Sequence, residues 1–315
     1  GGGSKVHVVQ KLAAMLVGCV QPLTACFGSR DPPSVLMPAS VRPTAAGRQP
    51  QGKKIACAKG ICLEQVKELK DKFQGSSVND ILSAVLALTL KHYLEEQGDS
   101  VVSHWKGLSA CFSVSLRKPG ESIRETFGNR VCNDFMRFPF TEMTDGVQTV
   151  WSVKRQIDLV KCSPAALACD LALRVVARFL SGRQLAFFLK HCIAKYTILL
   201  SNVPGPQTPC FLGGEEVEDL AFYTFLPVGC YCGLVSYNGK VSCSFASDAG
   251  LPDPQKLADR WAREFDDLYS HVMAIEGTLE EPQGSVLSFP SPLSRAATGA
   301  VVVVVGAVGL ACVVG

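Results

Sequence analysis

The spacing of apolar residues along the first half of the chain predicts helices. From Leu63 to Phe73 apolar residues recur at helical spacing with charged residues between them, which predicts an amphipathic surface helix. From Val78 to Glu95 apolar residues cover most of the helical circumference, so we predict a buried helix there. Two or three further helices are predicted between Asp145 and Lys195.

Strand patterns mark the sequence before and after these later helices. Leu108 to Leu116 has the composition of a strand, and Thr197 to Val203 is a short apolar run that ends at a rigid Pro-Gly-Pro turn. Cys230–Ser236 and Lys240–Ala246 flank Asn238-Gly239, a dipeptide that tolerates the positive φ angles of a tight turn. The two segments on either side of Asn238-Gly239 are therefore predicted to form a β-hairpin.

The last predicted helix has both a start signal and an apolar face. Asp253 can cap it, Pro254 suits its first position, and apolar residues from Leu257 to Val272 repeat along one side. Strands and helices thus alternate without a phosphate-binding glycine-rich loop. We predict one layered α/β domain that spans residues 55–276.

Segments outside this domain have a different composition. We interpret residues 1–54 as an inter-domain helix, Val6 to Phe27, followed by a Pro-, Gly- and Arg-rich linker, and residues 277–295 as a flexible linker. Residues 296–315 carry no charge and are long enough to cross a bilayer, which predicts a transmembrane or membrane-dipping tail. Low-complexity sequence is the alternative for this Val- and Gly-rich run.

Charge and cysteine spacing exclude several kinds of site. The net charge of +3 arises from 31 basic and 28 acidic residues that are spread along the chain, so we expect no nucleic-acid partner. The 14 cysteines form no Cys-x-x-Cys pair and no Cys/His cluster, which argues against a metal site. Several lie in apolar stretches, and we interpret them as structural free thiols of a reducing compartment.

The residues alone assemble no catalytic centre. None of the five histidines is followed four residues later by aspartate, and no Gly-x-Ser-x-Gly nucleophile motif occurs. His92 and His191 lie in predicted helices and are interpreted as satisfied structural histidines.

A series of short motifs resembles the C-terminal domain of the wax ester synthase/diacylglycerol acyltransferase family. The resemblance covers roughly residues 53–269, and its Asn-Asp and Asn-Val-Pro-Gly-Pro elements are the most specific. In chain order the motifs are Ser77-Val78-Asn79-Asp80, Phe112–Arg117, Gly128-Asn129-Arg130, Leu200–Pro206 and Gly233–Gly239.

This resemblance implies a fold and a reaction. The family is similar to chloramphenicol acetyltransferase-like, CoA-dependent acyltransferases, in which two α/β halves enclose a tunnel. In the family a His-His-x-x-x-Asp-Gly motif of the N-terminal half deprotonates an alcohol, which attacks acyl-CoA. This chain has no such motif. We therefore expect it to form the other half of the tunnel, to be inactive alone, and to act with an N-terminal catalytic half on acyl-CoA and a fatty alcohol or diacylglycerol, without a bound cofactor.

The resemblance also suggests site residues. Asn79 and Asp80 match the family's Asn-Asp pair and, at a helix start, can cap backbone N–H groups and brace a loop beside the tunnel. Asn202, Pro204 and Gly205 match the second strong motif, where the Asn can orient a carbonyl and the turn is rigid. A purely structural role is the alternative for both motifs. Arg117 and Asn129 complete the set of possible tunnel residues.

Two other classes of protein compete with the enzyme-half interpretation. A non-catalytic remnant could retain a lipid groove or a protein interface, and a peptide-synthetase condensation-like domain could share the fold. The second is disfavoured by Asn-Val-Pro-Gly-Pro together with Ser-Tyr-Asn-Gly. For the enzyme we expect association with a membrane surface, on the cytosolic side of the endoplasmic reticulum.

Overall fold

A computed structural model describes residues 28, 30–39, 52–104, 107–115, 131–161, 163–226 and 228–282. The predicted helix Val6–Phe27 and the apolar tail 296–315 lie outside these residues. Within them, no helix is both long enough and apolar enough to cross a bilayer.

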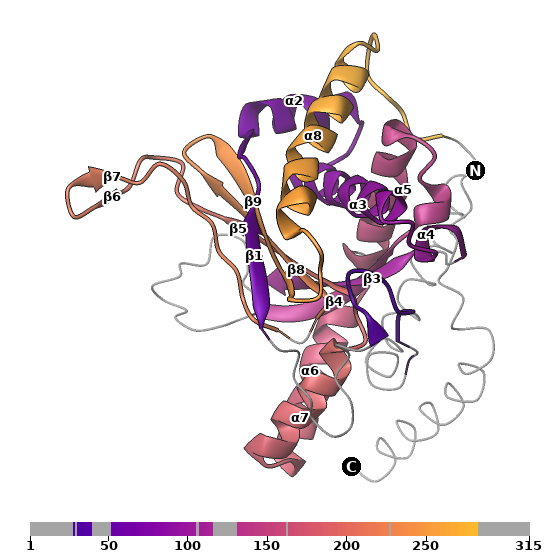
Figure 1. The fold of residues 1–315 in the computed structure, drawn as a ribbon, viewed down its shortest axis with the longest axis vertical. Helices are drawn as coiled ribbons and strands as arrows, with labels where there is room; N and C mark the ends of the chain where they lie inside the picture. The colour runs from indigo at the N-terminus through magenta and orange to yellow at the C-terminus, as the bar shows by residue number, and fades with distance from the viewer. Residues whose placement is uncertain are drawn as a thin grey trace.

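A mixed sheet forms the centre of the domain (Figure 1). Its three middle strands β8, β5 and β3 run parallel, and each outer strand pairs antiparallel with its neighbour. The predicted layered α/β fold class is confirmed. The strand order is β1 (Lys53–Cys57), β9 (Lys240–Asp248), β8 (Cys230–Tyr237), β5 (Ile198–Pro204), β3 (Leu108–Ser115) and β4 (Val131–Phe138), with β2 (Ile61–Cys62) also paired to β9.

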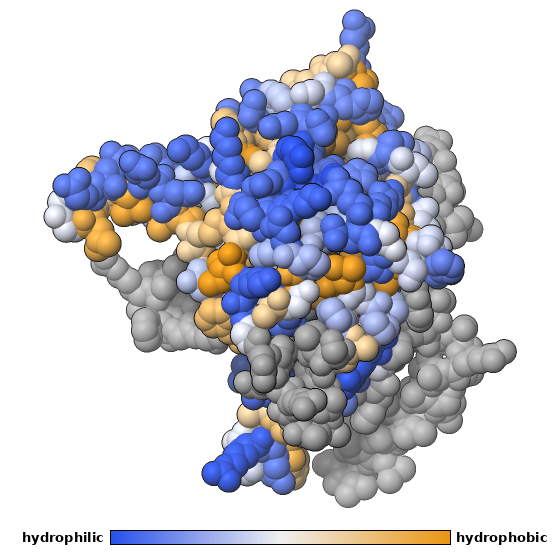
Figure 2. Space-filling view, in the orientation of Figure 1, coloured by the Kyte–Doolittle hydropathy of each residue, from blue (hydrophilic) through white to orange (hydrophobic). Residues whose placement is uncertain are grey.

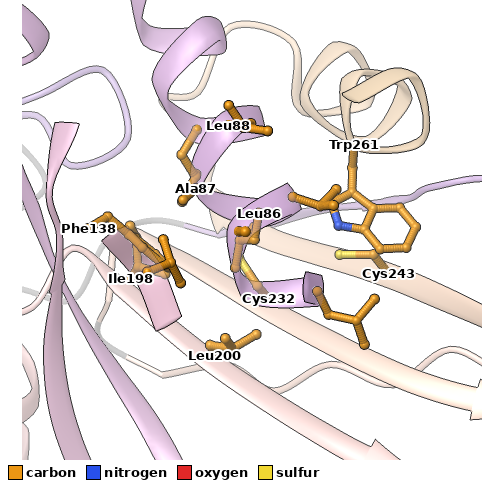
Figure 3. Packing of buried hydrophobic residues seen from close by; sticks show 14 of the residues in the cluster. Leu86, Ala87, Leu88, Phe138, Ile198, Leu200, Cys232, Cys243 and Trp261 are labelled. Atoms are coloured by element: carbon orange, nitrogen blue, oxygen red, sulfur yellow. The ribbon is translucent and has the colours of Figure 1, made fainter. Parts of the chain in front are cut away.

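One face of the sheet is covered by the main helices, which pack around α3. Nearly every side chain of α3 from Asp80 to Leu90 is buried, because this helix lies between the sheet and its neighbours α5 and α8. Figure 3 shows Leu86 of α3 near Cys232 and Trp261 near Cys243. The predicted buried helix is confirmed. The helices on this face are α2 (Leu63–Lys72), α3 (Val78–Glu96), α5 (Gly146–Lys161) and α8 (Pro254–Met273), with the short α4 (Val101–His104) and 3-10 turn η2 (Phe140–Glu142) beside them.

The predicted hairpin and the predicted last helix are also confirmed. Asn238 and Gly239 have φ angles of 43° and 77°, which lets the chain reverse in two residues between β8 and β9. Asp253 accepts a hydrogen bond from the Lys256 N–H at 3.2 Å and caps α8. Local signals were sufficient in both places.

The other face of the sheet is covered by an extended segment and not by a full layer of helices. Side chains that alternate with the helix-facing ones, such as Leu199 and Tyr231, pack there against the partly buried Phe222. The Ser244 hydroxyl donates to the Phe222 carbonyl, and the Ser242 hydroxyl donates to the Asp219 carboxylate at 2.6 Å. This segment follows an arm that leaves the body of the domain (Figure 1), formed by β6 (Phe211–Leu212) and β7 (Glu215–Glu216).

Two further helices project from the domain at the end opposite α2 (Figure 1). These are α6 (Ala165–Phe179), which touches β4, and α7 (Gly182–Ile193), which returns the chain to the sheet at β5. They fall where the sequence predicts helices, but most of their side chains are exposed or half-buried.

Residues 30–39 differ from the predicted linker. Leu36 and Met37 are fully buried, and Asp31 is buried beside the sheet. The Asp31 carboxylate accepts hydrogen bonds from the backbone N–H and hydroxyl groups of Ser109 and Thr197. Burial raises the pKa of this carboxyl, and those hydrogen bonds oppose the rise. The sequence pattern indicated a linker because Leu36 and Met37 stand in a Pro-rich segment that has neither helical nor strand periodicity.

Candidate functional site

The first turn of α3 and the carboxyl ends of β5 and β8 meet at one end of the sheet. We call this region the motif edge. The Asn202 side-chain N–H donates to the Asn79 Oδ1 at 3.2 Å, although the two residues are 123 positions apart. The sequence-predicted pairs Asn79-Asp80 and Asn202 with Pro204-Gly205 therefore occupy one place. The motif edge consists of Asn79, Asp80, Asn202, Pro204, Gly205 and Ser236.

The central strands diverge at the motif edge. The parallel pairing of β3 with β5 ends at Phe112 and Leu200, whereas the pairing of β5 with β8 continues to Pro204 and Ser236. Over the same stretch β3 remains paired with β4 as far as Ser115. Beyond Leu200, β5 thus presents one unpaired strand edge among the described strands, and Asn202 lies on it.

Asp80 is a buried helix cap. Its Oδ2 accepts hydrogen bonds from the Ser77 N–H at 2.7 Å and the Ser77 hydroxyl at 2.8 Å, and the Ser77 hydroxyl oxygen accepts from the Asp80 N–H. Lys161, at the end of α5, lies 3.3 Å from Asp80 Oδ1. The predicted capping role is confirmed for Asp80. Asn79 differs, because its described side-chain bond goes to Asn202.

The Pro204-Gly205-Pro206 turn packs directly on the Ser-Tyr-Asn-Gly motif. The Gly205 N–H donates to the Ser236 carbonyl at 2.9 Å, and the Asn238 N–H donates to the Pro206 carbonyl at 3.1 Å. A Cβ atom at Gly205 would lie 2.3 Å from the Ser236 carbonyl oxygen, so only glycine fits here without displacing a strand. The two motifs are therefore parts of one structural unit.

Two residues that contribute to the motif edge were not predicted from the sequence, and two of the residues that were predicted are not described by the structure. Ser236 belongs to the Gly233–Gly239 motif but was not predicted as a site residue, and its hydroxyl accepts a hydrogen bond from the Gln207 side chain at 3.1 Å. Lys161 had no local signal, because its contact with Asp80 joins residues 81 positions apart. Arg117 and Asn129 lie outside the described residues.

The described histidines do not lie at the motif edge. His92 Nδ1 is 2.7 Å from Glu264 Oε1, and Arg260 also donates to that oxygen at 2.8 Å. The interpretation of His92 as a satisfied structural histidine is confirmed. His92 follows Asn79 by thirteen residues on the same helix, which at ~1.5 Å per residue is about 20 Å along its axis.

The charged partners of Glu264 make its contribution to stability depend on pH. Burial raises the pKa of Glu264, but hydrogen bonds from His92 and Arg260 outweigh it, and the net pKa is below its ordinary value. A lowered folded-state pKa stabilises the fold above the unfolded pKa, and this stabilisation is lost as the pH falls through the folded one. We expect Glu264→Gln to lower the free energy of unfolding at neutral pH and to have a smaller effect under acidic conditions. Urea titrations across the acidic range measure this, and a difference that does not depend on pH would contradict it.

Some of the described thiols are buried among apolar groups, whereas Cys57 and Cys62 are exposed. Cys230 and Cys232 lie in the main core with their sulfur atoms 3.9 Å apart, and burial raises the pKa of Cys232 and Cys243. No group of three or more His, Cys, Asp or Glu residues within the described ranges could hold a metal ion.

Comparison with known proteins finds similarity to one family of acyltransferases. A family model described as the WS/DGAT C-terminal domain, for wax ester synthase/diacylglycerol acyltransferase, matches residues 127–269. Wax ester synthase/diacylglycerol acyltransferase 2 of Arabidopsis thaliana is 25% identical over 219 residues, which cover 63% of this chain and 45% of that protein. A Mycobacterium tuberculosis protein named as a diacylglycerol O-acyltransferase is 25% identical over 242 residues, 71% of this chain and 43% of the relative. The chain thus spans less than half the length of these curated relatives.

Two solved structures are among those similar to this chain. The wax ester synthase/diacylglycerol acyltransferase from Marinobacter aquaeolei VT8 has a TM-score of 0.48 at 19% identity, and the match covers 70% of this chain and 49% of that one. The epimerization domain from the third module of tyrocidine synthetase B has a TM-score of 0.47 at 15% identity, with the same coverage of 70% and 49%.

Proposed function

We propose that this chain forms one half of an O-acyltransferase that moves a long-chain acyl group from acyl-CoA to a fatty alcohol or diacylglycerol, because a family model of the WS/DGAT C-terminal domain matches residues 127–269. The observation that carries the proposal is the hydrogen bond between Asn79 and Asn202, since it joins the family's two most specific motifs at one place. The complementary half would bring the His-His-x-x-x-Asp-Gly motif.

The geometry of the motif edge supports a position beside the substrate tunnel. Ligands of open α/β sheets bind outside the carboxyl ends of the strands, and β5 and β8 end here. β5 has also separated from β3 at this point, which leaves polar strand edge available to a substrate. Asn202 and Pro204 are exposed in this chain, so a second half can reach them.

The reaction assigns separate tasks to the two halves. The acceptor hydroxyl attacks the thioester carbonyl, its proton passes to a base, the C–S bond breaks, and the CoA thiol leaves as the ester forms. A positioned base contributes ~10²–10⁴-fold to such a step. We assign the base to the complementary half. In this chain, the amides of Asn79 and Asn202 would orient the reacting carbonyl, and Asp80 with Lys161 would hold the first turn of α3 in place.

We expect residues 1–315 alone to transfer no acyl group from a long-chain acyl-CoA to a fatty alcohol or diacylglycerol. No histidine of the described residues lies at the motif edge to accept the alcohol's proton. Radiolabelled acyl-CoA and product extraction test this. Addition of an N-terminal half that carries His-His-x-x-x-Asp-Gly should produce activity. Turnover by the chain alone that is abolished by His92→Ala would overturn the assignment of the base, and a folded, reassembled protein without activity would favour the non-catalytic remnant.

In the reassembled enzyme we expect Asn202→Ala to lower kcat/KM by about tenfold or more, which corresponds to ~1.4 kcal/mol of transition-state stabilisation. The melting temperature should change little, because the Asn79–Asn202 bond is exposed. Asn79→Ala should have a similar effect, and the double variant should be no worse than the single ones, since both lose the same pair. Gln255→Ala serves as the control, because it removes another exposed side-chain amide, on α8, which donates to the Cys57 carbonyl and the Asp259 carboxylate. Unchanged kinetics in both Asn variants would make the pair structural.

A further inference from the structure

The helix α6 exposes a stripe of large apolar side chains. Leu167, Leu171, Val175 and Phe179 follow one another at intervals of four residues, so they lie along one side of the helix. Their exposed fractions are 66%, 64%, 51% and 81%. Single exposed apolar residues are normal on protein surfaces, but a continuous stripe indicates an interaction surface.

The next helix continues this surface with a groove. Phe187 is 59% exposed and helps to line an open, largely apolar depression of about 520 Å³ on α7. The side chains of Arg183 and His191 also line this depression. Its lining residues are Leu180, Arg183, Gln184, Phe187, Phe188 and His191.

Positive charge accompanies the apolar surface. Arg174 and Arg178 directly precede Val175 and Phe179, and Arg183 and Lys190 are exposed on α7. Figure 2 shows hydrophilic and hydrophobic residues side by side on this projection. Within α6 and α7 the one acidic residue is Asp170, which lies 2.8 Å from Arg174. No Asp or Glu then occurs in the sequence until Glu215.

We propose that α6 and α7 dock the protein on the surface of a bilayer that contains anionic phospholipids. The apolar stripe would enter the boundary between headgroups and acyl chains, and the four basic side chains would contact lipid phosphates. Charge complementarity selects this occupant, since a basic surface with one acidic residue, around exposed Phe and Leu side chains, matches a negatively charged leaflet. Helices that lie in the headgroup region of a bilayer need not be long enough to span the membrane. This inference rests on the proposed function only for the lipid nature of the substrates.

Vesicle binding by the full chain tests the proposal without an activity assay. Phe179→Trp places a reporter at the end of the stripe. On phosphatidylcholine vesicles that contain phosphatidylserine, we expect its emission, relative to the unsubstituted chain, to shift to shorter wavelength and to be quenched by brominated lipid. Phe211→Trp on the β6–β7 arm, a similarly exposed position, is the control and should show neither change. An unshifted, unquenched Phe179→Trp on vesicles would overturn the proposal, even where the protein sediments with them through another segment.

Charge reversal tests whether the basic residues of α6 and α7 contribute to membrane binding. Arg178→Glu with Arg183→Glu should weaken binding to phosphatidylserine-containing vesicles by about tenfold or more. Lys240→Glu, at the exposed β8–β9 turn, should not. Circular dichroism establishes that each variant is folded. Equal binding of the Arg variant and the control would overturn the role of the basic residues. If Phe179→Ser instead converts a dimer to a monomer in solution and vesicle binding is absent, the surface binds a second copy and the membrane proposal is wrong.

Discussion

Replacement of Asp80 by alanine is expected to lower the free energy of unfolding by about 2 kcal/mol, the upper part of the range for lost helix caps. Its carboxylate is fully buried, accepts two hydrogen bonds from Ser77 and pairs with Lys161. Lys161 is half exposed, so its amine can return to water and adds no buried-charge penalty. The melting temperature should fall by about 4–8 °C for a domain of this size, measured by calorimetry.

A second capping box in the chain provides the matched control for Asp80. Ser181 and Gln184 form the same reciprocal bonds at the start of α7, but both residues are exposed. We expect Gln184→Ala to cost well under half as much as Asp80→Ala, because water can replace an exposed cap. Equal losses in the two variants would show that burial at Asp80 adds nothing to the cap.

Substitution of Gly205 by alanine is the second change with a large expected effect. The new methyl group would lie 2.3 Å from the Ser236 carbonyl oxygen, which already accepts the Gly205 N–H. Relief requires β5 and β8 to separate at their ends, and overpacking of this kind typically costs about 1–3 kcal/mol. We expect a loss of that size in urea unfolding, and reassembled enzyme should lose activity because Asn202 moves with β5.

Gly182 serves as the control for Gly205. A Cβ atom there meets no other atom within 4 Å, and the residue lies in the first turn of α7. Gly182→Ala should therefore leave stability unchanged or raise it slightly, since alanine favours helix. A Gly205→Ala variant as stable as Gly182→Ala would mean that the turn can relax without cost.

Local signals predicted much of the fold. The apolar circumference of α3, the Asn238-Gly239 turn and the Asp253 cap each concern neighbouring residues, and the structure confirms all three. The capping role of Asp80 was predictable for the same reason, because Ser77 is three residues away.

Contacts between distant segments were not predictable from such patterns. The bond between Asn79 and Asn202 depends on the parallel order of the middle strands, which no local periodicity encodes. The Lys161 contact with Asp80 likewise depends on how α5 packs against α3. The family resemblance predicted both Asn motifs as site residues, but only the fold brings their side chains together.

The pairing of β1 with β9 constrains when the domain can form during synthesis. Lys53 and Asp248 are register partners, and their side chains form an ion pair at 2.6 Å. β1 is an outermost strand whose only neighbour in the strand order is β9. A nascent chain that has not yet emerged past residue 248 therefore leaves β1 incompletely paired. Contacts between residues so far apart in sequence form slowly, and the edge of β1 stays exposed to aggregation until the β8–β9 hairpin pairs with it.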